Sequence, residues 1–323
     1  MGGSISMKIL AWAGREDIAM VYMAEVGGGK LVEFVESVQP PLPREKKWVL
    51  IVSTLFGCPV RCLMCDAGSH YEGKLSREDI FAQIDFLVKK RFPNGSIPVD
   101  KFKIQLARMG EPSLNLNTLD ILEELPHRYK ATGLIPSIST IAPTGTDRFF
   151  NRLVEIKKNV YSRGRFQFQF SLHTTDERLR DHLVPAKKWN FARMAEYGEE
   201  FYEKDDRKIT LNFALAEEMP VDPDVLLRHF DPGKFLIKIT PVNPTHQAVQ
   251  NRLFSYIDPY REGKDDRLVR NLRAAGYKVI VSIGEVEENR IGSNCGQYVM
   301  RHLKAKGHVK NGYTYRTQMY PSG

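Results

Sequence analysis

The sequence has little cysteine and no long apolar run. Four cysteines occur in 323 residues, at positions 58, 62, 65 and 295. That number is too small, and three of the four are too clustered, for a disulfide scaffold, which indicates a reducing, cytoplasmic environment and thiols with a chemical role. No apolar run reaches the roughly 18 to 20 residues that a membrane span needs, so we expect no membrane partner.

The composition also lacks the features of a disordered chain and shows only a modest excess of one charge. Hydrophobic residues make up 42% and charged residues 27%, which is ordinary globular usage. Lys and Arg outnumber Asp and Glu by 47 to 39, a net charge of +8. The last stretch, residues 299–323, contains no acid. This balance favours anionic partners but does not by itself identify one.

Strand-like and helix-like stretches alternate along most of the chain, which predicts a parallel sheet or barrel of βα units. We expect an accessory β segment at 1–47, a βα barrel at 48–283 and a C-terminal segment at 284–323. A helix should begin at Ser76, which has Asp79 three residues on. The predicted strands are Trp48–Thr54, Phe102–Leu106, Ile135–Ser139, Phe166–Leu172, Ile209–Leu215, Phe235–Thr240 and Tyr277–Ile283.

Polar residues and cysteines follow the carboxyl ends of these predicted strands, where barrel enzymes place their chemistry. Cys58, Cys62 and Cys65 form a C-x3-C-x2-C motif after the first of them. Three thiols at this spacing can hold a soft-metal centre with one open position, such as a four-iron cluster. A zinc site would need a fourth ligand from elsewhere, and plain buried thiols are the third interpretation.

This motif, on the loop after the first strand of a βα repeat, resembles that of the radical S-adenosylmethionine superfamily. The resemblance implies a partial (β/α)6 barrel, α/β in class, with a small β-rich N-terminal extension and a C-terminal loop and helix segment. It also implies a [4Fe-4S] cluster on the three cysteines and S-adenosyl-L-methionine as cofactor. In that superfamily one electron, from a donor such as flavodoxin or ferredoxin, cleaves this cofactor to a 5′-deoxyadenosyl radical.

Further motifs between about Val35 and Gln297 resemble the RlmN and Cfr type of ribosomal RNA adenine methylases. Met109 to Asn117 resembles their Gly-Glu-Pro segment, Arg178 to Pro185 their Asp-x-x-Arg-Asp-x-x-Val-Pro-like stretch, and Asn294 to Gln297 the segment with their methyl-bearing cysteine. The resemblance implies that Cys295 is catalytic and that Glu36 is equivalent to the general base. It implies cofactor binding by Gly110, Glu111, Ser139, Ser171, Leu172, His173 and Asn243.

The chain also departs from that family. The family uses a second catalytic cysteine seven residues before the first cluster ligand, and this chain has Ile51 there. Only about 30 residues precede Leu31, where the family has a helical RNA-binding domain. Met64 stands where the superfamily usually has an aromatic residue, a change that cofactor binding should tolerate because methionine is apolar and adaptable.

We therefore expect a radical enzyme that modifies a small-molecule or nucleotide substrate, by alkyl or methyl transfer assisted by Cys295. One alternative is an RNA adenine methyltransferase that uses an external thiol. Another is a binding protein without catalysis, in which the metal is a structural clip.

Overall fold

The structure is a computed structural model that describes residues 7–258, 267–294, 298–299 and 312–320. Its N-terminal part is an antiparallel meander of β1 (Lys8–Arg15), β2 (Ala19–Val26) and β3 (Lys30–Ser37), followed by β4 (Trp48–Val52), which pairs antiparallel to β3. Within the predicted β segment 1–47 the sequence has two short apolar runs, Ala19–Val26 and Leu31–Val38. They are observed as β2 and β3, whereas β1 was not predicted. The accessory segment is thus continuous with the main sheet.

From β4 onward the sheet is parallel. Its order within the described residues is β12-β11-β10-β9-β8-β7-β4-β3-β2-β1-β13, where β13 is Gln318–Met319. No pairing among those residues joins β12 to the other edge, so the sheet is open. The parallel strands after β4 are β7 (Phe102–Leu106), β8 (Leu134–Thr140), β9 (Gln167–Ser171), β10 (Ile209–Leu215), β11 (Phe235–Pro241) and β12 (Lys278–Val281). The predicted mixed α/β architecture is confirmed.

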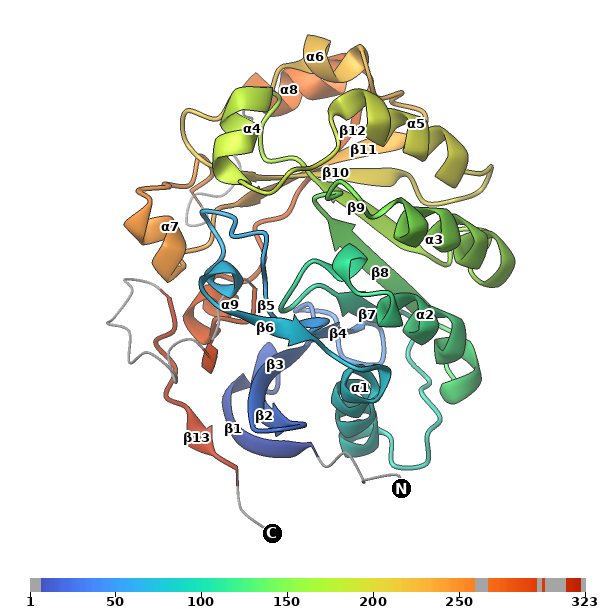
Figure 1. Ribbon diagram of the computed structural model, residues 1–323, viewed down its shortest axis with the longest axis vertical. Helices are drawn as coiled ribbons and strands as arrows, with labels where there is room; N and C mark the ends of the chain where they lie inside the picture. Colours follow the sequence, from blue (N-terminus) through green and yellow to red (C-terminus); the bar gives the residue numbers. More distant parts are fainter. Residues whose placement is uncertain (1–6, 259–266, 295–297, 300–311, 321–323) are drawn as a thin grey trace.

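Helices connect these strands and cover the outer face of the sheet (Figure 1). The first begins after Ser76, whose hydroxyl accepts from the backbone N–H of Asp79 in a capping box, as predicted. Along the chain the helices are α1 (Arg77–Arg91), α2 (Asn117–Arg128), α3 (Asp147–Val160), α4 (Glu177–Leu183), α5 (Phe191–Phe201), α6 (Pro223–Leu227), α7 (His246–Gln250), α8 (Arg267–Ala274) and α9 (Val286–Ile291). In the described residues, none is long and apolar enough to cross a membrane.

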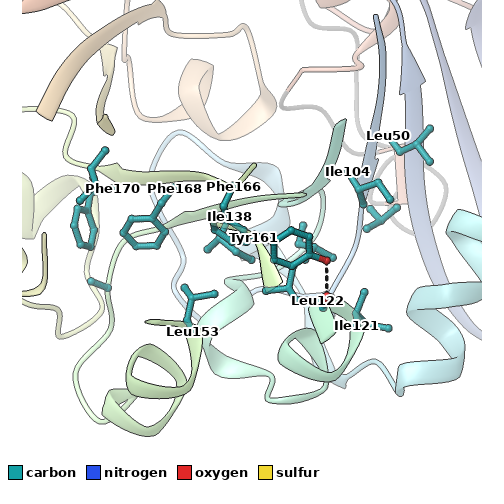
Figure 2. Packing of buried hydrophobic residues seen from close by; sticks show 14 of the residues in the cluster. Leu50, Ile104, Ile121, Leu122, Ile138, Leu153, Tyr161, Phe166, Phe168 and Phe170 are labelled. Carbon is teal, nitrogen blue, oxygen red and sulfur yellow. Dashed lines mark hydrogen bonds between the residues drawn. The ribbon is translucent and has the colours of Figure 1, made fainter. Parts of the chain in front are cut away.

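The main hydrophobic core lies between the sheet and these helices (Figure 2). Alternate strand residues such as Phe168 and Phe170 of β9 point into it and meet Leu122 and Leu153 of the helices. The hydroxyl of Tyr161 donates to the carbonyl of Leu122. Because strand side chains alternate between faces, the residues between these core positions face the inner, concave side of the sheet.

On β9 and β10 that inner side is polar. On β9 the residues that alternate with the two phenylalanines are Gln167, Gln169 and Ser171. On β10, Thr210 and Asn212 alternate with core residues. A polar inner face beneath a helix-covered outer face leaves the concave side suited to a polar ligand rather than to core packing.

Candidate functional site

The three clustered cysteines lie on a loop that two short strands hold in place. Strand β5 (Leu55–Gly57) precedes the loop and pairs with β6 (Tyr71–Lys74), which follows the one-turn helix η1 (Asp66–Ser69). The backbone N–H of Cys58 donates to the carbonyl of His70 at 2.9 Å. Gly57 has φ +77°, and a Cβ there would come within 1.7 Å of the His70 carbonyl oxygen. Only glycine allows the loop to leave β5 in this way.

The thiols of this loop lie in an apolar setting, with Cys58 buried and Cys62 and Cys65 half-buried. None of the three forms a disulfide, and all belong to one apolar cluster with Val60 and Ile141. Burial raises the pKa of Cys58 to about 12. Burial, followed by the charges of Cys65 and Cys58, raises the pKa of Cys62. The three sulfurs therefore lie near enough to repel one another once ionised, so a bound cation would be needed to hold them as thiolates.

No group of three or more His, Cys, Asp or Glu side chains in the described part of the chain surrounds a single point closely enough to hold one metal ion. The donor set that is present consists of three soft thiols in an apolar setting. This set fits an iron–sulfur cluster, in which each thiolate binds a different iron.

Glu111 lies buried beside the cysteines. It caps the short helix η2 (Pro112–Leu114), and its charge contributes to the raised pKa of both Cys58 and Cys62. One carboxylate oxygen accepts from the Thr140 hydroxyl at 2.6 Å, and the other accepts from the backbone N–H of Ile141 at 3.0 Å. These bonds fix the carboxylate at the ends of two strands, which is where a ligand with an ammonium group could reach it.

We expect Glu111→Gln to weaken binding of S-adenosylmethionine while the iron content stays normal. The amide is neutral, and a hydrogen bond to a charged acceptor is about twice as strong as one to a neutral acceptor. Equilibrium binding to the anaerobic, iron-loaded protein measures the effect. The matched control is Glu155→Gln, because Glu155 is exposed on α3. Equal affinity in both variants and wild type would remove Glu111 from the site.

The other predicted cofactor residues lie at strand ends around the same edge. Ser139 on β8 pairs with Gln169, and Ser171 on β9 pairs with Asn212. Both serines are partly buried on the inner face. The side chain of Leu172 instead packs fully buried in the main core, so only its backbone can face a ligand. Gly110 has φ +104°, and a Cβ there would meet the Leu55 side chain at 2.5 Å.

His173 is held as a neutral imidazole. It has φ +70°, and its Nδ1 accepts from the backbone N–H of Ala214 at 3.2 Å. Burial and then the charge of Arg180 lower its pKa to about 4. The proton of the neutral ring is therefore on Nε2, which can donate to a ligand on the inner face.

Arg180 is a buried cation that sequence reasoning did not single out. It donates to the carbonyls of Trp189 at 2.8 Å and Ile141 at 3.3 Å, and its buried Nε has no hydrogen-bond partner among the residues that the structure describes. Burial lowers its pKa to about 10, and the charge of Cys62 opposes that shift. The only sequence feature that pointed to Arg180 was its position in the stretch 178–185. Its contact with Ile141, which is distant in sequence, could not be predicted.

The cysteine loop is fastened to the C-terminal half of the chain through Asp66, the residue after Cys65. Its buried carboxylate accepts from the backbone N–H groups of His246 at 3.2 Å and Gln247 at 2.9 Å, at the start of α7. The hydroxyl of Tyr313 donates to it at 2.8 Å. Asp66 thereby fixes the loop against two segments that arrive late in the sequence.

Asn243 follows β11, and it lines one small cavity together with Asn294 and Tyr313. Asn294 directly precedes Cys295, which lies outside the described residues together with Gln297. The predicted cofactor turn and the start of the predicted methyl-carrying segment are thus brought together.

Glu36 is not brought to the cysteines. Its carboxylate accepts from Arg91 of α1 at 2.6 Å, and from Trp48 and Tyr22 at 3.2 and 3.1 Å. These partners lie on the helix-covered side of the sheet. The catalytic role of Glu36 stays a prediction, and the observed contacts are those of a structural ion pair.

Glu33, three residues earlier, points to the opposite face. One carboxylate oxygen accepts from Nε of Arg108 at 2.8 Å, and the other accepts from the backbone N–H of Val299 at 3.1 Å. Arg108 also donates to the carbonyls of Ser293 and Gly292, at 2.6 and 2.7 Å. This buried pair holds the chain on both sides of residues 295–297.

Comparisons with known proteins agree with this geometry. No protein-family model matches the chain. It is 28% identical over 274 residues to a dual-specificity RNA methyltransferase RlmN of Chlorobium phaeobacteroides, a match that covers 83% of this chain and 71% of that protein. A Thermus thermophilus protein of the same name is 28% identical over 62% of this chain, but the match covers only 54% of that protein.

A solved radical SAM methyltransferase from Sphaerobacter thermophilus has the same fold, with a TM-score of 0.64 and 19% identity over 90% of this chain and 80% of that one. In sequence and in fold the chain resembles the radical S-adenosylmethionine superfamily. Within it the chain resembles the RlmN and Cfr methyltransferases, and it is a transferase-like enzyme.

Proposed function

We propose that this protein uses a [4Fe-4S] cluster and S-adenosylmethionine to modify a small-molecule or nucleotide substrate by radical alkyl or methyl transfer, in a reducing cytoplasm. The observation that carries the proposal is the apolar cluster of Cys58, Cys62 and Cys65 beside Glu111, at the carboxyl edge of an open parallel sheet. The bound pair of cofactors would supply a 5′-deoxyadenosyl radical.

The protein's residues would bind and orient these groups. The three cysteines would hold the cluster, and Glu111 would accept from the cofactor's ammonium. Ser139, Ser171 and Asn243 would hydrogen-bond the rest of the cofactor, and neutral His173 could donate from Nε2. The apolar cluster around the thiols would help to keep water from the radical, which is the protein's main contribution beyond binding and orientation.

Cys295 would be the working thiol. Because Ile51 replaces the family's second cysteine, an adduct on Cys295 would need an external thiol for release. Two acids on β3, Glu33 and Glu36, could lie near the segment that carries Cys295. The contacts favour Glu33, because its carboxylate accepts a hydrogen bond from the backbone N–H of Val299. An electron donor such as flavodoxin or ferredoxin is part of the proposal.

The second candidate is an RNA adenine methyltransferase, and the names of the relatives favour it. Binding of RNA through phosphate contacts would fall steeply with salt, with a log–log slope near 0.7 per contact for single strands. Absence of such a slope would favour the small substrate. The third candidate is a binding protein without catalysis, in which a metal only stabilises the structure. Metal analysis of anaerobically purified protein that finds zinc and no iron would support it.

Anaerobic reduction of the iron-loaded protein with S-adenosylmethionine and no substrate tests the main proposal. We expect 5′-deoxyadenosine to accumulate with time. Iron-loaded protein that binds the cofactor yet forms no 5′-deoxyadenosine under strong reduction would contradict a radical function.

We expect the tryptic peptide 291–301 from protein grown in cells to carry the mass of one added methylene group on Cys295. The reason is that this is the chain's only thiol outside the cluster motif. Mass spectrometry of that peptide measures the modification, and Cys58→Ala is the control that should lack it. An unmodified peptide in wild type would show that Cys295 does not carry a methyl group.

A further inference from the structure

Arg180 is a buried cation at the cysteine loop that the proposed function does not use. Its side chain lies on α4 and is 3% exposed. The carbonyl of Leu183, on the same helix, accepts from the backbone N–H of Leu63, the residue after Cys62, at 2.9 Å. Nη2 of Arg180 itself donates to the carbonyl of Ile141, which packs in the same apolar cluster as the cysteines. These contacts hold the helix and its cation against the predicted iron ligands.

The guanidinium of Arg180 is surrounded by neutral groups. Its hydrogen bonds go to the carbonyls of Trp189 and Ile141 and, at 3.9 Å, to the sulfur of Met194. The ring of Phe191 lies 5.5 Å from its Cζ. Within the described ranges its Nε has no acceptor, and no carboxylate forms an ion pair with it. A buried charge held only by neutral groups is costly, which indicates that an anionic partner belongs beside it.

Two acids on the same helix do not provide that partner. Glu177 and Asp181 are exposed to water, and Asp181 forms an ion pair with Lys188 at 2.5 Å. Burial lowers the pKa of Arg180 to about 10, and the charges of Asp181, Glu177 and then Cys62 oppose that shift. Arg180 is therefore protonated at neutral pH, and of these three charges only that of Cys62 lies in the apolar site.

An iron–sulfur centre on the three cysteines would be that anionic partner. An oxidised four-iron core with three thiolates has a net negative charge, and the one electron that reduces it adds another. A fixed cation beside the centre stabilises the reduced form more than the oxidised form. Net charge and hydrogen bonding around such a centre are the protein's means of setting its reduction potential.

We propose that Arg180 is the buried counter-charge of the iron–sulfur centre on Cys58, Cys62 and Cys65 and raises its reduction potential. The electron donor then has a smaller potential difference to overcome when it reduces the centre. This role rests on the proposed function, because it requires the centre, and it adds the residue that sets the potential of that centre. Arg180 acts through its charge on the centre, so it is a positioning residue rather than a catalytic one.

Redox titration of the iron-loaded protein without S-adenosylmethionine tests the counter-charge. Arg180→Gln should lower the equilibrium constant for one-electron reduction about tenfold, which is about 59 mV for a one-electron couple, because a charge beside a buried centre is removed. Arg180→Lys keeps a cation and should restore most of the potential. Arg178→Gln is the matched control, since Arg178 is exposed on the same helix, where water and salt screen its charge.

A potential in Arg180→Gln equal to that of wild type would overturn the counter-charge. Weaker binding of S-adenosylmethionine at that unchanged potential would overturn it too, because Arg180 would then act on the cofactor.

The iron content of the variants covers a failure of Arg180→Gln to load, in which case Arg180→Met is titrated in its place. Full iron in Arg180→Lys and none in either neutral variant would support the need for a cation. Loss of iron in all three variants would show a structural role and overturn the proposal. If the potential shift is found and wild type still forms no 5′-deoxyadenosine, the radical function alone is overturned.

Discussion

Replacing Cys58, Cys62 or Cys65 with alanine is expected to remove the iron absorbance of the protein and all of its cleavage of S-adenosylmethionine. Each thiolate would bind one iron, and the loop offers no other thiol to replace it. Iron analysis and the yield of 5′-deoxyadenosine after anaerobic reconstitution measure the two losses.

The matched control for this series is Cys295→Ala, which removes the remaining cysteine and should keep its full iron content. The three loop variants should also remain folded, since a buried thiol replaced by alanine leaves only a small cavity. A loop variant that binds as much iron as wild type would refute the assignment of the cluster ligands.

Arg108→Met is expected to lower the free energy of unfolding by about 3 to 5 kcal/mol, because it leaves the Glu33 carboxylate buried without its partner. It also leaves the carbonyls of Gly292 and Ser293 without their donor. Urea unfolding measures the change. Arg148→Met, at an exposed position of α3, is the control and should have little effect.

The double variant Glu33→Leu with Arg108→Met should recover much of that loss, because replacing both members of a buried pair by apolar residues is often neutral. An exposed ion pair contributes only about 0 to 1 kcal/mol. If Arg108→Met lowered the free energy of unfolding by no more than that, the structural role of the buried pair would be contradicted. Recovery in the double variant would separate the cost of an unpaired charge from the loss of packing.

The strands of the parallel sheet could be predicted because they are apolar runs. Strand Ile209–Leu215 was predicted and is observed with the same bounds. Its pattern is clear because core residues occupy every second position, and the residues between them, such as Thr210 and Asn212, are buried as well. Strand β1 could not be predicted in this way. It lies near the edge of the sheet, where its pairing with β13 depends on residues at the other end of the chain.

The cysteine loop was identifiable because the spacing of its thiols is local. The contacts that position this loop and the neighbouring chain could not be identified from sequence, because they join residues far apart. Asp66 contacts Gln247 across 181 residues, and Glu33 contacts Val299 across 266. The pattern of β3 contains Glu33 and Glu36, and an odd separation places them on opposite faces of a strand. Sequence alone does not tell which face is the inner one. Glu36 was named from the resemblance of its strand to the family, and its catalytic role stays a prediction, whereas the structure shows that Glu33 is the acid that contacts Val299.

The Asp66 contacts also set an order of events during synthesis. At about 5 to 20 residues per second, the 181 residues between Asp66 and Gln247 take roughly 10 to 40 s to translate, and Tyr313 follows later. Throughout that interval the cysteine loop has left the ribosome without the backbone donors that fasten it. The nascent chain therefore exposes its three thiols before the fold encloses them, and a stalled ribosome would prolong their exposure to oxidants.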